Sequence, residues 1–208
     1  MKITYKKGKG DKIHVSADGE YVFTVDEGYF FSLNIKEDAD ISSEEFNRIT
    51  EKAGERRAYN YAVSLLSRRE HTVNEITEKL RRKGYTQFAE NVCSRLISEG
   101  YLSDERFARL YVRELVNLKG YGKRRIKDEL LRKGVDRELV SDILEESDIP
   151  ESRLLEIINK KYLRYLDTEK GVQKTVNALL RLGYSYGEIR DALREIDDEN
   201  EFYEVTDE

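Results

Sequence analysis

The stretch "KGYGKRRIKDELLRKGV", residues 119–135, combines two glycines, a dense run of basic residues and apolar residues at helical spacing. Leu130 and Leu131 follow Ile126 by four and five residues, a spacing that places all three toward one buried side of a helix. Gly134 follows this pattern, and a glycine at that place commonly ends a helix by adopting left-handed backbone. The stretch therefore predicts a short amphipathic helix, entered through a Gly120-Tyr121-Gly122 turn.

The same pattern occurs earlier in the chain. When residues 55–84 are laid over residues 105–134, a shift of 50 without a gap, ten of thirty positions are identical, whereas composition alone gives roughly two. A weaker third copy keeps Val176 and Leu180, and its glycine, Gly183, comes one residue early. Each copy predicts three helices whose apolar faces are buried on one another. We therefore expect a mainly α protein with three tandem three-helix repeats in an elongated, curved array.

The N-terminal part has β character instead. Asp18-Gly19 separates two runs of alternating apolar residues, which is typical of a hairpin because both turn residues need positive φ. A third run, 29–35, is expected to continue this small sheet. The predicted apolar face of the hairpin consists of Ile13, Val15, Ala17, Tyr21, Phe23 and Val25.

Helix-start signals divide the rest of the chain. Ser42…Glu45, Thr72…Glu75 and Ser185…Glu188 have the spacing of capping boxes, in which a hydroxyl accepts a hydrogen bond from an amide of the first helical turn. Pro150 suits a new helix start. The predicted organisation is a small β-rich extension (1–41), a linking helix with the first repeat (42–100), the second repeat (101–149), the third repeat (150–197) and an acidic tail (198–208).

The charge of the 208-residue chain is unevenly spread. The net charge is −5, yet residues 56–133 hold 19 basic and 10 acidic residues, or +9, while residues 1–55 carry −4. A basic middle between acidic ends suits an anionic partner of composite character. The sequence has no apolar run of about 18 residues, and Cys93 is its one cysteine, so we expect a cytoplasmic protein without a membrane span.

Enzymatic function is not expected. The glycines at 120 and 122 are separated by one residue, not by the four of a nucleotide-binding P-loop. The two histidines, His14 and His71, have no metal-ligand spacing to another residue, and Cys93 falls on an apolar helix face. We expect no catalytic residue, no metal and no cofactor.

Lys123, Arg124 and Arg125 fall at a predicted helix N-terminus, where cations are mildly unfavourable. Their position favours an anionic partner, and the alternative is a solvated helix face. The cations of "LRRKGY" (80–85) and "LLRKGV" (130–135) fall in a last helical turn instead, where the helix dipole stabilises them without a partner. Tyr121, Tyr184 and Tyr186 are predicted in turns, where a ring could stack on a partner.

The stretches "LLSRREHTVNEITEKLRRKGY" (65–85) and "GYLSDERFARLYVRELVNLKGYGKRRIKDELLRKGV" (100–135) resemble the RecX family, the bacterial regulators of the recombinase RecA. The resemblance covers roughly residues 56–195 and is weakest in the third repeat, where Lys170 and Val172 replace the two glycines. It implies a non-enzymatic protein of three-helix repeats that binds the RecA–DNA filament and lowers its ATPase and strand-exchange activity.

The resemblance divides the motif residues into two sets. Tyr101, Leu102, Phe107, Ile126, Leu130 and Gly134 have the positions of architectural residues. The candidate contacts to RecA or DNA, together with the equivalent cations of the first repeat, are Arg81, Arg82, Lys83, Arg109, Arg113, Lys123, Arg124, Arg125, Lys127, Arg132 and Lys133.

Two other functions remain open from the sequence. One is a helical repeat protein that binds single- or double-stranded DNA by itself, without RecA. The other is a scaffold that binds another protein through the hairpin region. In each case we expect a monomer that does not associate with membranes.

Overall fold

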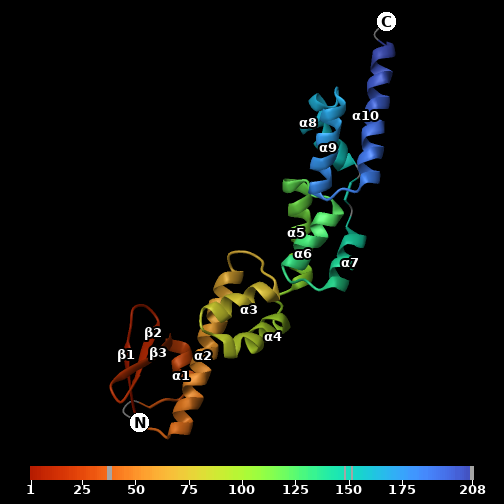
Figure 1. Ribbon diagram of the computed structural model, residues 1–208. Helices are drawn as coiled ribbons and strands as arrows, with labels where there is room; N and C mark the ends of the chain where they lie inside the picture. Colours follow the sequence, from red (N-terminus) through yellow and green to blue (C-terminus); the bar gives the residue numbers. More distant parts are fainter. Residues whose placement is uncertain (37–38, 148, 151, 207–208) are drawn as a thin grey trace. The chain divides into compact units, whose positions relative to one another are not determined.

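The computed structural model describes residues 1–36, 39–147, 149–150 and 152–206, with side chains described as far as residue 197. The chain forms two compact units, Met1–Leu102 and Ser103–Glu208. The described residues are mostly helical, with an antiparallel sheet at the N-terminus, which confirms the predicted class (Figure 1).

The sheet of the first unit has the strand order β3-β2-β1-β4. Asp18 (φ 50°) and Gly19 (φ 86°) form the turn between β2 and β3, so the predicted hairpin is confirmed. Neither β1 nor β4 was predicted, although Ile3 and Tyr5 alternate within β1. The strands are β1 (Lys2–Lys7), β2 (Lys12–Ala17), β3 (Glu20–Asp26) and β4 (Ala39–Asp40).

One side chain of the hairpin was assigned to the wrong face. The register shifts between Val15, which opposes Phe23, and Ser16, which opposes Tyr21, so that Val22 is an extra residue on β3. Such a bulge reverses the alternation of side chains. Tyr21 is consequently 63% exposed, with its hydroxyl 3.1 Å from Oγ1 of Thr24, and does not belong to the buried face.

The predicted third strand, 29–35, is also wrong. Residues Glu27–Ser32 form the helix α1, because Oδ1 of Asp26 accepts a hydrogen bond of 2.9 Å from the Tyr29 amide and caps the first turn. Phe30 is buried and the neighbouring Phe31 is 60% exposed. The aromatic run at residues 29–31 is compatible with the two-residue period of a strand and with the 3.6-residue period of a helix. The cap from Asp26 stabilises the helix.

The long helix α2 (Ser43–Leu66) belongs to two hydrophobic cores. The Ser42 hydroxyl accepts from the Glu45 amide at 3.1 Å, as the capping box predicts. Ile49 and Ala53 pack in the core of the sheet, while Ala58 and Ala62 pack in the core of the first repeat. One continuous helix therefore connects the sheet to the first repeat.

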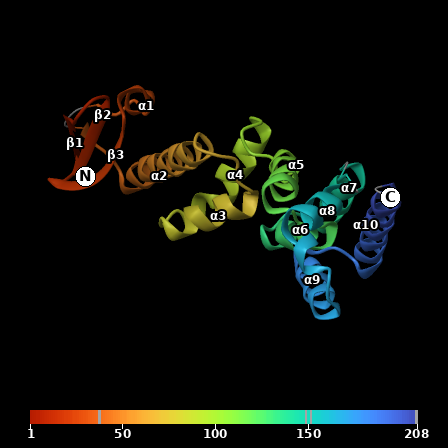
Figure 2. The same cartoon turned by 90° about the horizontal axis from the view of Figure 1, so that it is seen from above.

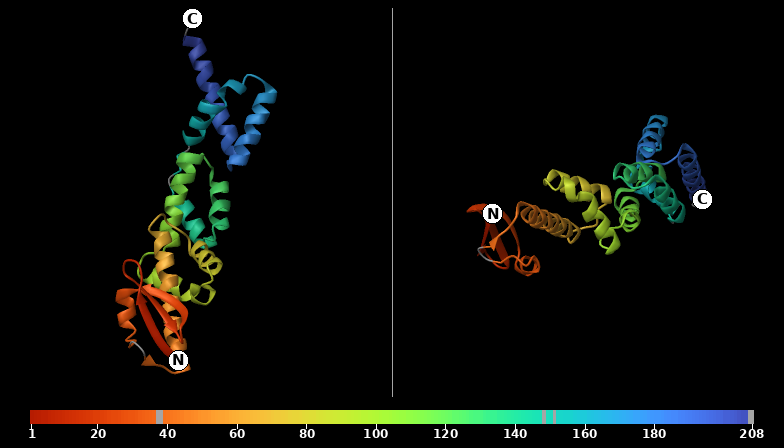
Figure 3. Two further views of the ribbon diagram at one scale, coloured as in Figure 1. Left: turned by 90° about the vertical axis from the view of Figure 1, so that its left-hand side faces the viewer. Right: turned by 90° about the horizontal axis from the view of Figure 1, so that it is seen from below.

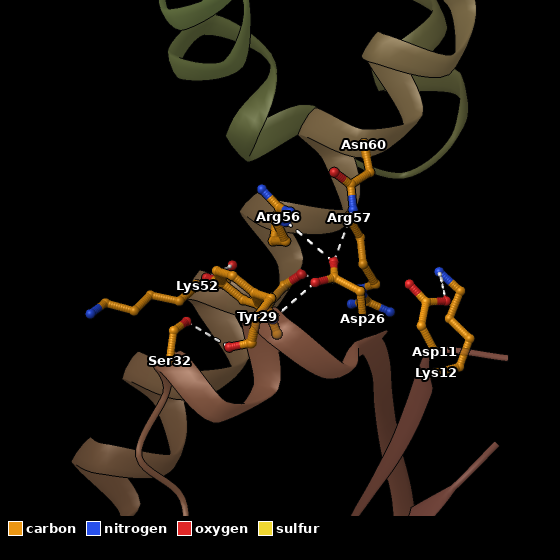
Figure 4. Close-up of polar contacts among 10 residues, drawn as sticks. Asp11, Lys12, Asp26, Tyr29, Ser32, Lys52, Arg56, Arg57 and Asn60 are labelled. Atoms are coloured by element: carbon orange, nitrogen blue, oxygen red, sulfur yellow. Dashed lines mark hydrogen bonds and ion pairs between the residues drawn. The ribbon is translucent and has the colours of Figure 1, made fainter.

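Asp26 ties the sheet to α2 (Figure 4). Its Oδ2 accepts from Nε of Arg56 and from Nδ2 of Asn60, both at 3.4 Å. Burial alone would raise the pKa of this carboxyl, but the hydrogen bond from the Tyr29 amide and the charge of Arg56 outweigh burial and lower it. The carboxylate therefore stays ionised where the sheet, α1 and α2 meet.

The first repeat is completed by α3 (Val73–Arg82), a 3₁₀ turn (Thr86–Phe88) and α4 (Ala89–Ser98), with α3 beside α4 (Figure 2). The Thr72 hydroxyl accepts from the Glu75 amide at 3.1 Å, and Gly84 has φ 87°, so both predicted helix ends are confirmed. His71 is buried, with Nδ1 2.8 Å from Oε2 of Glu75.

The second repeat contains residues 119–135, the stretch with two glycines and a dense run of basic residues. Ile126 and Leu130 are fully buried in its core, and Gly134 (φ 82°) has the left-handed backbone expected at the end of the helix. Gly120 (φ 67°), in the predicted turn before the helix, is also left-handed. The elements are α5 (Asp104–Glu114), a π-helical turn (Leu115–Lys119), α6 (Lys123–Arg132) and α7 (Arg137–Glu146).

The third repeat consists of α8 (Ser152–Lys161), a 3₁₀ turn (Leu163–Tyr165), α9 (Glu169–Leu182) and α10 (Tyr186–Thr206). Figure 3 shows α9 beside α10. Gly183 (φ 94°) ends α9, and the amides and side-chain oxygens of Ser185 and Glu188 bond reciprocally at 2.6 and 3.2 Å.

Tyr184 is not available for stacking on a partner, contrary to the prediction. It is 5% exposed and belongs to the core of the third repeat, and its hydroxyl has no hydrogen-bond partner among the described residues. Burial raises its pKa to about 12. The turn that contains it packs closely against the second repeat, since a Cβ on Gly183 would lie 2.5 Å from Cβ of Arg125.

Candidate partner-binding surface

All eleven predicted contact residues belong to three helices and their C-terminal ends. Arg81 and Arg82 lie in the last turn of α3, and Lys83 is its C-cap residue. Arg109 and Arg113 lie on α5. The rest are on α6 or follow it, where the buried Ile126 and Leu130 turn the basic residues outward: Lys123, Arg124, Arg125, Lys127, Arg132 and Lys133.

Some of these cations already have partners within the chain. Arg81 pairs with Glu78 at 3.1 Å and Arg132 with Glu129 at 3.2 Å, both within one helix. Arg109 contacts Glu105 at 3.0 Å, and it also contacts Glu146, from α7, at 2.7 Å. Lys133 Nζ lies 5.8 Å from the centre of the Tyr111 ring. These residues carry charge that is partly neutralised by neighbours.

Six of the predicted cations are exposed, and their side chains form no hydrogen bond or ion pair with the residues that the structure describes. They are Arg82, Lys83, Arg113, Lys123, Arg124 and Lys127. Lys123 and Lys127 are one helical turn apart on α6, so their side chains emerge on the same side of that helix. An exposed cation without a partner in its own chain is free to bind an external anion.

The N-terminus of α6 meets the C-terminus of α9. The Gly122 amide donates to the Leu182 carbonyl at 2.8 Å, and Nη1 of Arg125 donates to the Arg181 carbonyl at 2.7 Å. The last carbonyls of a helix have no partner within that helix and carry partial negative charge. Arg125, a cation that is unfavourable at the start of its own helix, therefore lies close to the negative end of another helix.

Arg125 has further contacts at this junction. Its guanidinium carbon lies 4.2 Å from the centre of the Tyr121 ring, and its Nε is 3.9 Å from a carboxylate oxygen of Glu129. The side chain is 38% exposed. Arg125 thus connects the second repeat to the third, and its role as a partner contact stays a prediction.

The junction also requires small residues. A Cβ on Gly122 would lie 2.7 Å from the carbonyl carbon of Gly183, so the two backbones approach too closely for a side chain. A second connection comes from α8, where Nη2 of Arg153 donates to the Asn117 carbonyl in the π-helical turn at 2.7 Å. Neither contact can be predicted from the sequence, because no local pattern connects residues so far apart in the chain.

The described residues contain no group of three or more His, Cys, Asp or Glu that could hold a metal ion. Cys93 is buried in the core of the first repeat, as predicted. His14 is exposed on the sheet, with Nδ1 2.6 Å from Oγ1 of Thr24. Among the described helices, none is long and apolar enough to cross a lipid bilayer.

Two family models match this chain. The model of the first three-helix domain of RecX matches residues 58–96, and that of the second three-helix domain matches residues 103–144. The first match contains the end of α2 with α3 and most of α4, and the second contains α5, α6 and most of α7. The helices that carry the candidate cations are therefore the helices that define these domains.

Similar proteins cover nearly the whole chain. The regulatory protein RecX of Caldanaerobacter subterraneus subsp. tengcongensis is 33% identical over 189 residues, which are 90% of this chain and 95% of that protein. The regulatory protein RecX of Clostridium acetobutylicum is 28% identical over 208 residues, 96% of each chain.

Two solved structures have a similar fold. A crystal structure of a regulatory protein RecX superposes with a TM-score of 0.70 at 23% identity, over 91% of this chain and 97% of that one. The structure of RecX from Lactobacillus salivarius gives 0.63 at 26% identity, over 69% and 97%. The sequence and structural similarities together show that this chain belongs to the RecX family of regulatory proteins.

Proposed function

We propose that this protein binds the RecA–DNA filament and inhibits or modulates RecA ATPase activity, strand exchange and filament growth in recombination, DNA repair and the SOS response. The observation that carries the proposal is the similarity to regulatory proteins RecX over 90% of this chain and 95% of a relative. The protein acts by binding in the cytoplasm, without a cofactor and without turning over a substrate.

The surface of α6 supports this proposal. Lys123, Arg124 and Lys127 are exposed and have no ion pair within the described residues, so an anionic partner can reach them without breaking an internal contact. The filament offers two kinds of anion, the phosphates of the DNA and the carboxylates of RecA. The predicted filament contacts lie in the first two repeats, within residues 42–149. The β-rich extension (1–41), the third repeat (150–197) and the acidic tail (198–208) are the other segments of the proposed organisation.

The decisive experiment measures the RecA filament with and without the protein. RecA ATPase activity on single-stranded DNA should fall as the protein is added, and imaging of single filaments should show slower growth or faster shrinkage. The protein alone should show no ATPase or nuclease activity. Unchanged ATPase activity and unchanged filament length at saturating protein would contradict the proposal.

A second function is favoured by the same unpaired cations: binding to nucleic acid without RecA. Exposed lysines and arginines bind phosphates in a manner that depends strongly on salt. The two functions differ in their dependence on the filament. If bare DNA competes as well as an equal amount of RecA–DNA filament, the second function is the better description.

A further inference from the structure

The third repeat has a hollow on each side of Arg164, away from the cations of α6. The first, of about 500 Å³, lies between the 3₁₀ turn Leu163–Tyr165 and the start of α9. The second, of about 590 Å³, lies toward the end of α8. Arg164 and Asp167 line both hollows, so the two form one continuous surface, which we call the Arg164 surface.

The Arg164 surface is positively charged. Lys170 and Lys174 line the first hollow, and Lys160 and Lys161 line the second. These four lysines form no ion pair with the described residues. Among the described residues that line the hollows, Asp167 is the one acidic side chain. Five cations against one carboxylate leave a local excess of positive charge that no contact within the described chain neutralises.

Aromatic side chains are interleaved with these cations. Tyr165 is 46% exposed, and the guanidinium of Arg164 lies 4.8 Å from the centre of its ring while Nη2 donates to its hydroxyl at 2.7 Å. Tyr162 lines the same hollow and Leu163 is 41% exposed beside it. A ring held open to solvent by a neighbouring guanidinium offers a flat apolar face among positive charges.

We infer that the Arg164 surface binds single-stranded nucleic acid, with the lysines at the phosphates and Tyr165 stacked on a base. Unpaired bases present flat faces to tyrosine, and positively charged grooves with aromatic residues bind single strands in this way. In a duplex the base faces are stacked on one another and cannot contact the Tyr165 ring. An acidic protein surface could pair with the lysines, but it would not explain the exposed ring. The inference rests on the proposed function and deepens it, because it makes the DNA strand a direct ligand of the third repeat.

The sequence signal was present in "KKYLRY", residues 160–165, but the third repeat departs from the other two, and only Lys174 among these cations has a basic counterpart, Arg124, in the repeated motif. The start of α9 adds to the positive potential. Thr168 caps this 14-residue helix by accepting from the Gly171 amide at 3.2 Å, and the N-terminal end of a helix carries partial positive charge. Lys170 and Lys174 lie on the first two turns of that helix.

The test uses the full-length protein without RecA, so that its failure is separate from failure of the proposed function. Fluorescence anisotropy measures binding to a labelled oligothymidine of about 20 nucleotides, between about 50 and 200 mM salt. The Lys170→Glu/Lys174→Glu variant should bind about tenfold or more weakly and with a shallower dependence on salt. Acidic residues near the start of α9 suit the helix dipole, so the fold should be retained.

Three further variants make the result specific. Tyr165→Ala should weaken binding about 5- to 150-fold, the factor that loss of one stacked base gives, whereas Tyr165→Phe keeps the ring and should bind nearly as well as wild type. Lys6→Glu/Lys9→Glu changes the net charge equally on the exposed surface of the first unit and should leave binding close to wild type.

Three results would overturn the inference. The first is no binding of wild type to the oligothymidine at low salt. The second is equal binding by wild type and the Lys170→Glu/Lys174→Glu variant, which would place the strand elsewhere. The third is binding to a duplex that is at least as tight and insensitive to Tyr165→Ala. In the second case, loss of RecA-filament binding by the Lys170→Glu/Lys174→Glu variant would show that the surface contacts protein and not the strand.

Discussion

Arg125, near the N-terminus of α6, donates a hydrogen bond of 2.7 Å to the carbonyl oxygen of Arg181, at the end of α9. These residues are 56 positions apart in the chain. The contact gives the negative end of α9 a cationic donor, and it changes the interpretation of the Lys123-Arg124-Arg125 cluster. One of its three cations stabilises the junction between two repeats, while the other two are exposed without a partner among the described residues.

Arg125→Ala should therefore lower stability. It removes the bond to the Arg181 carbonyl and the contact with the Tyr121 ring, so the free energy of unfolding should fall by about 1–2 kcal/mol. Urea unfolding measures the loss, and faster hydrogen exchange at the Gly122 amide locates it. Arg124→Ala is the matched control and should change stability by less than about 0.5 kcal/mol. Equal effects of the two substitutions would show that the junction contact contributes nothing.

Lys123→Glu/Arg124→Glu should separate binding from stability. Both residues are exposed at a helix N-terminus, where acidic residues are favourable, so the melting temperature should stay the same or rise slightly. Binding to the RecA filament should weaken about tenfold or more because like charges then face each other. The Lys6→Glu/Lys9→Glu variant controls for net charge. A stable variant that inhibits RecA as well as wild type would leave these two residues as solvated surface.

Gly122→Ala should destabilise the junction of the second and third repeats. The added Cβ would lie 2.7 Å from the carbonyl carbon of Gly183, and backbone must move to relieve that contact. Overpacking of this kind costs about 1–3 kcal/mol. Gly28→Ala, where the added Cβ would meet no atom of a more distant residue within 4 Å, is the control and should be neutral or mildly stabilising. Thermal unfolding of both variants measures the difference; the close approach is disproved if Gly122→Ala melts like wild type.

His71 should make the first unit sensitive to mild acid. Burial lowers the pKa of this imidazole below 6.5, an effect that the hydrogen bond with Glu75 only partly offsets. Below pH 6.5 the unfolded chain therefore binds a proton at His71 more readily than the folded chain does. The contribution of His71 to the free energy of unfolding is complete above pH 6.5 and declines as the pH falls from 6.5 through the folded-state pKa. Chemical unfolding at several pH values should show this decline.

The matched variant for this pH dependence is His71→Gln, which keeps a hydrogen-bond donor near Glu75 but does not titrate. Its free energy of unfolding should change less than that of wild type between pH 7 and 5. Asp26 does not confuse the measurement, because its lowered pKa gives a stabilisation that is nearly complete above its ordinary value of 3.8 and is lost only in more acidic solutions. Parallel curves for wild type and His71→Gln would exclude His71 as the cause.

The sequence by itself determined the local structure of this protein. The hydroxyls of Ser42, Thr72 and Ser185 each cap a helix three residues away, and Asp18-Gly19 forms the predicted turn. The glycines after the second helix of each repeat have positive φ, as expected. These features involve residues within a few positions of each other, so the physics that selects them is visible in a short window of sequence. The helical spacing of the apolar residues in α6 predicted in the same way that its basic residues are exposed.

Only the tertiary structure decided which of those basic residues have partners within the chain. Arg109 reaches Glu146, 37 positions away, and Arg125 reaches the end of α9. The bulge that exposes Tyr21 and the burial of Tyr184 also depend on packing against other elements. An arginine that binds a distant carbonyl and one that faces solvent have the same local sequence pattern, because hydrogen bonding and desolvation are set by what the fold brings near. The sequence therefore determined where the cations are, and the fold determined which of them remain available for a partner.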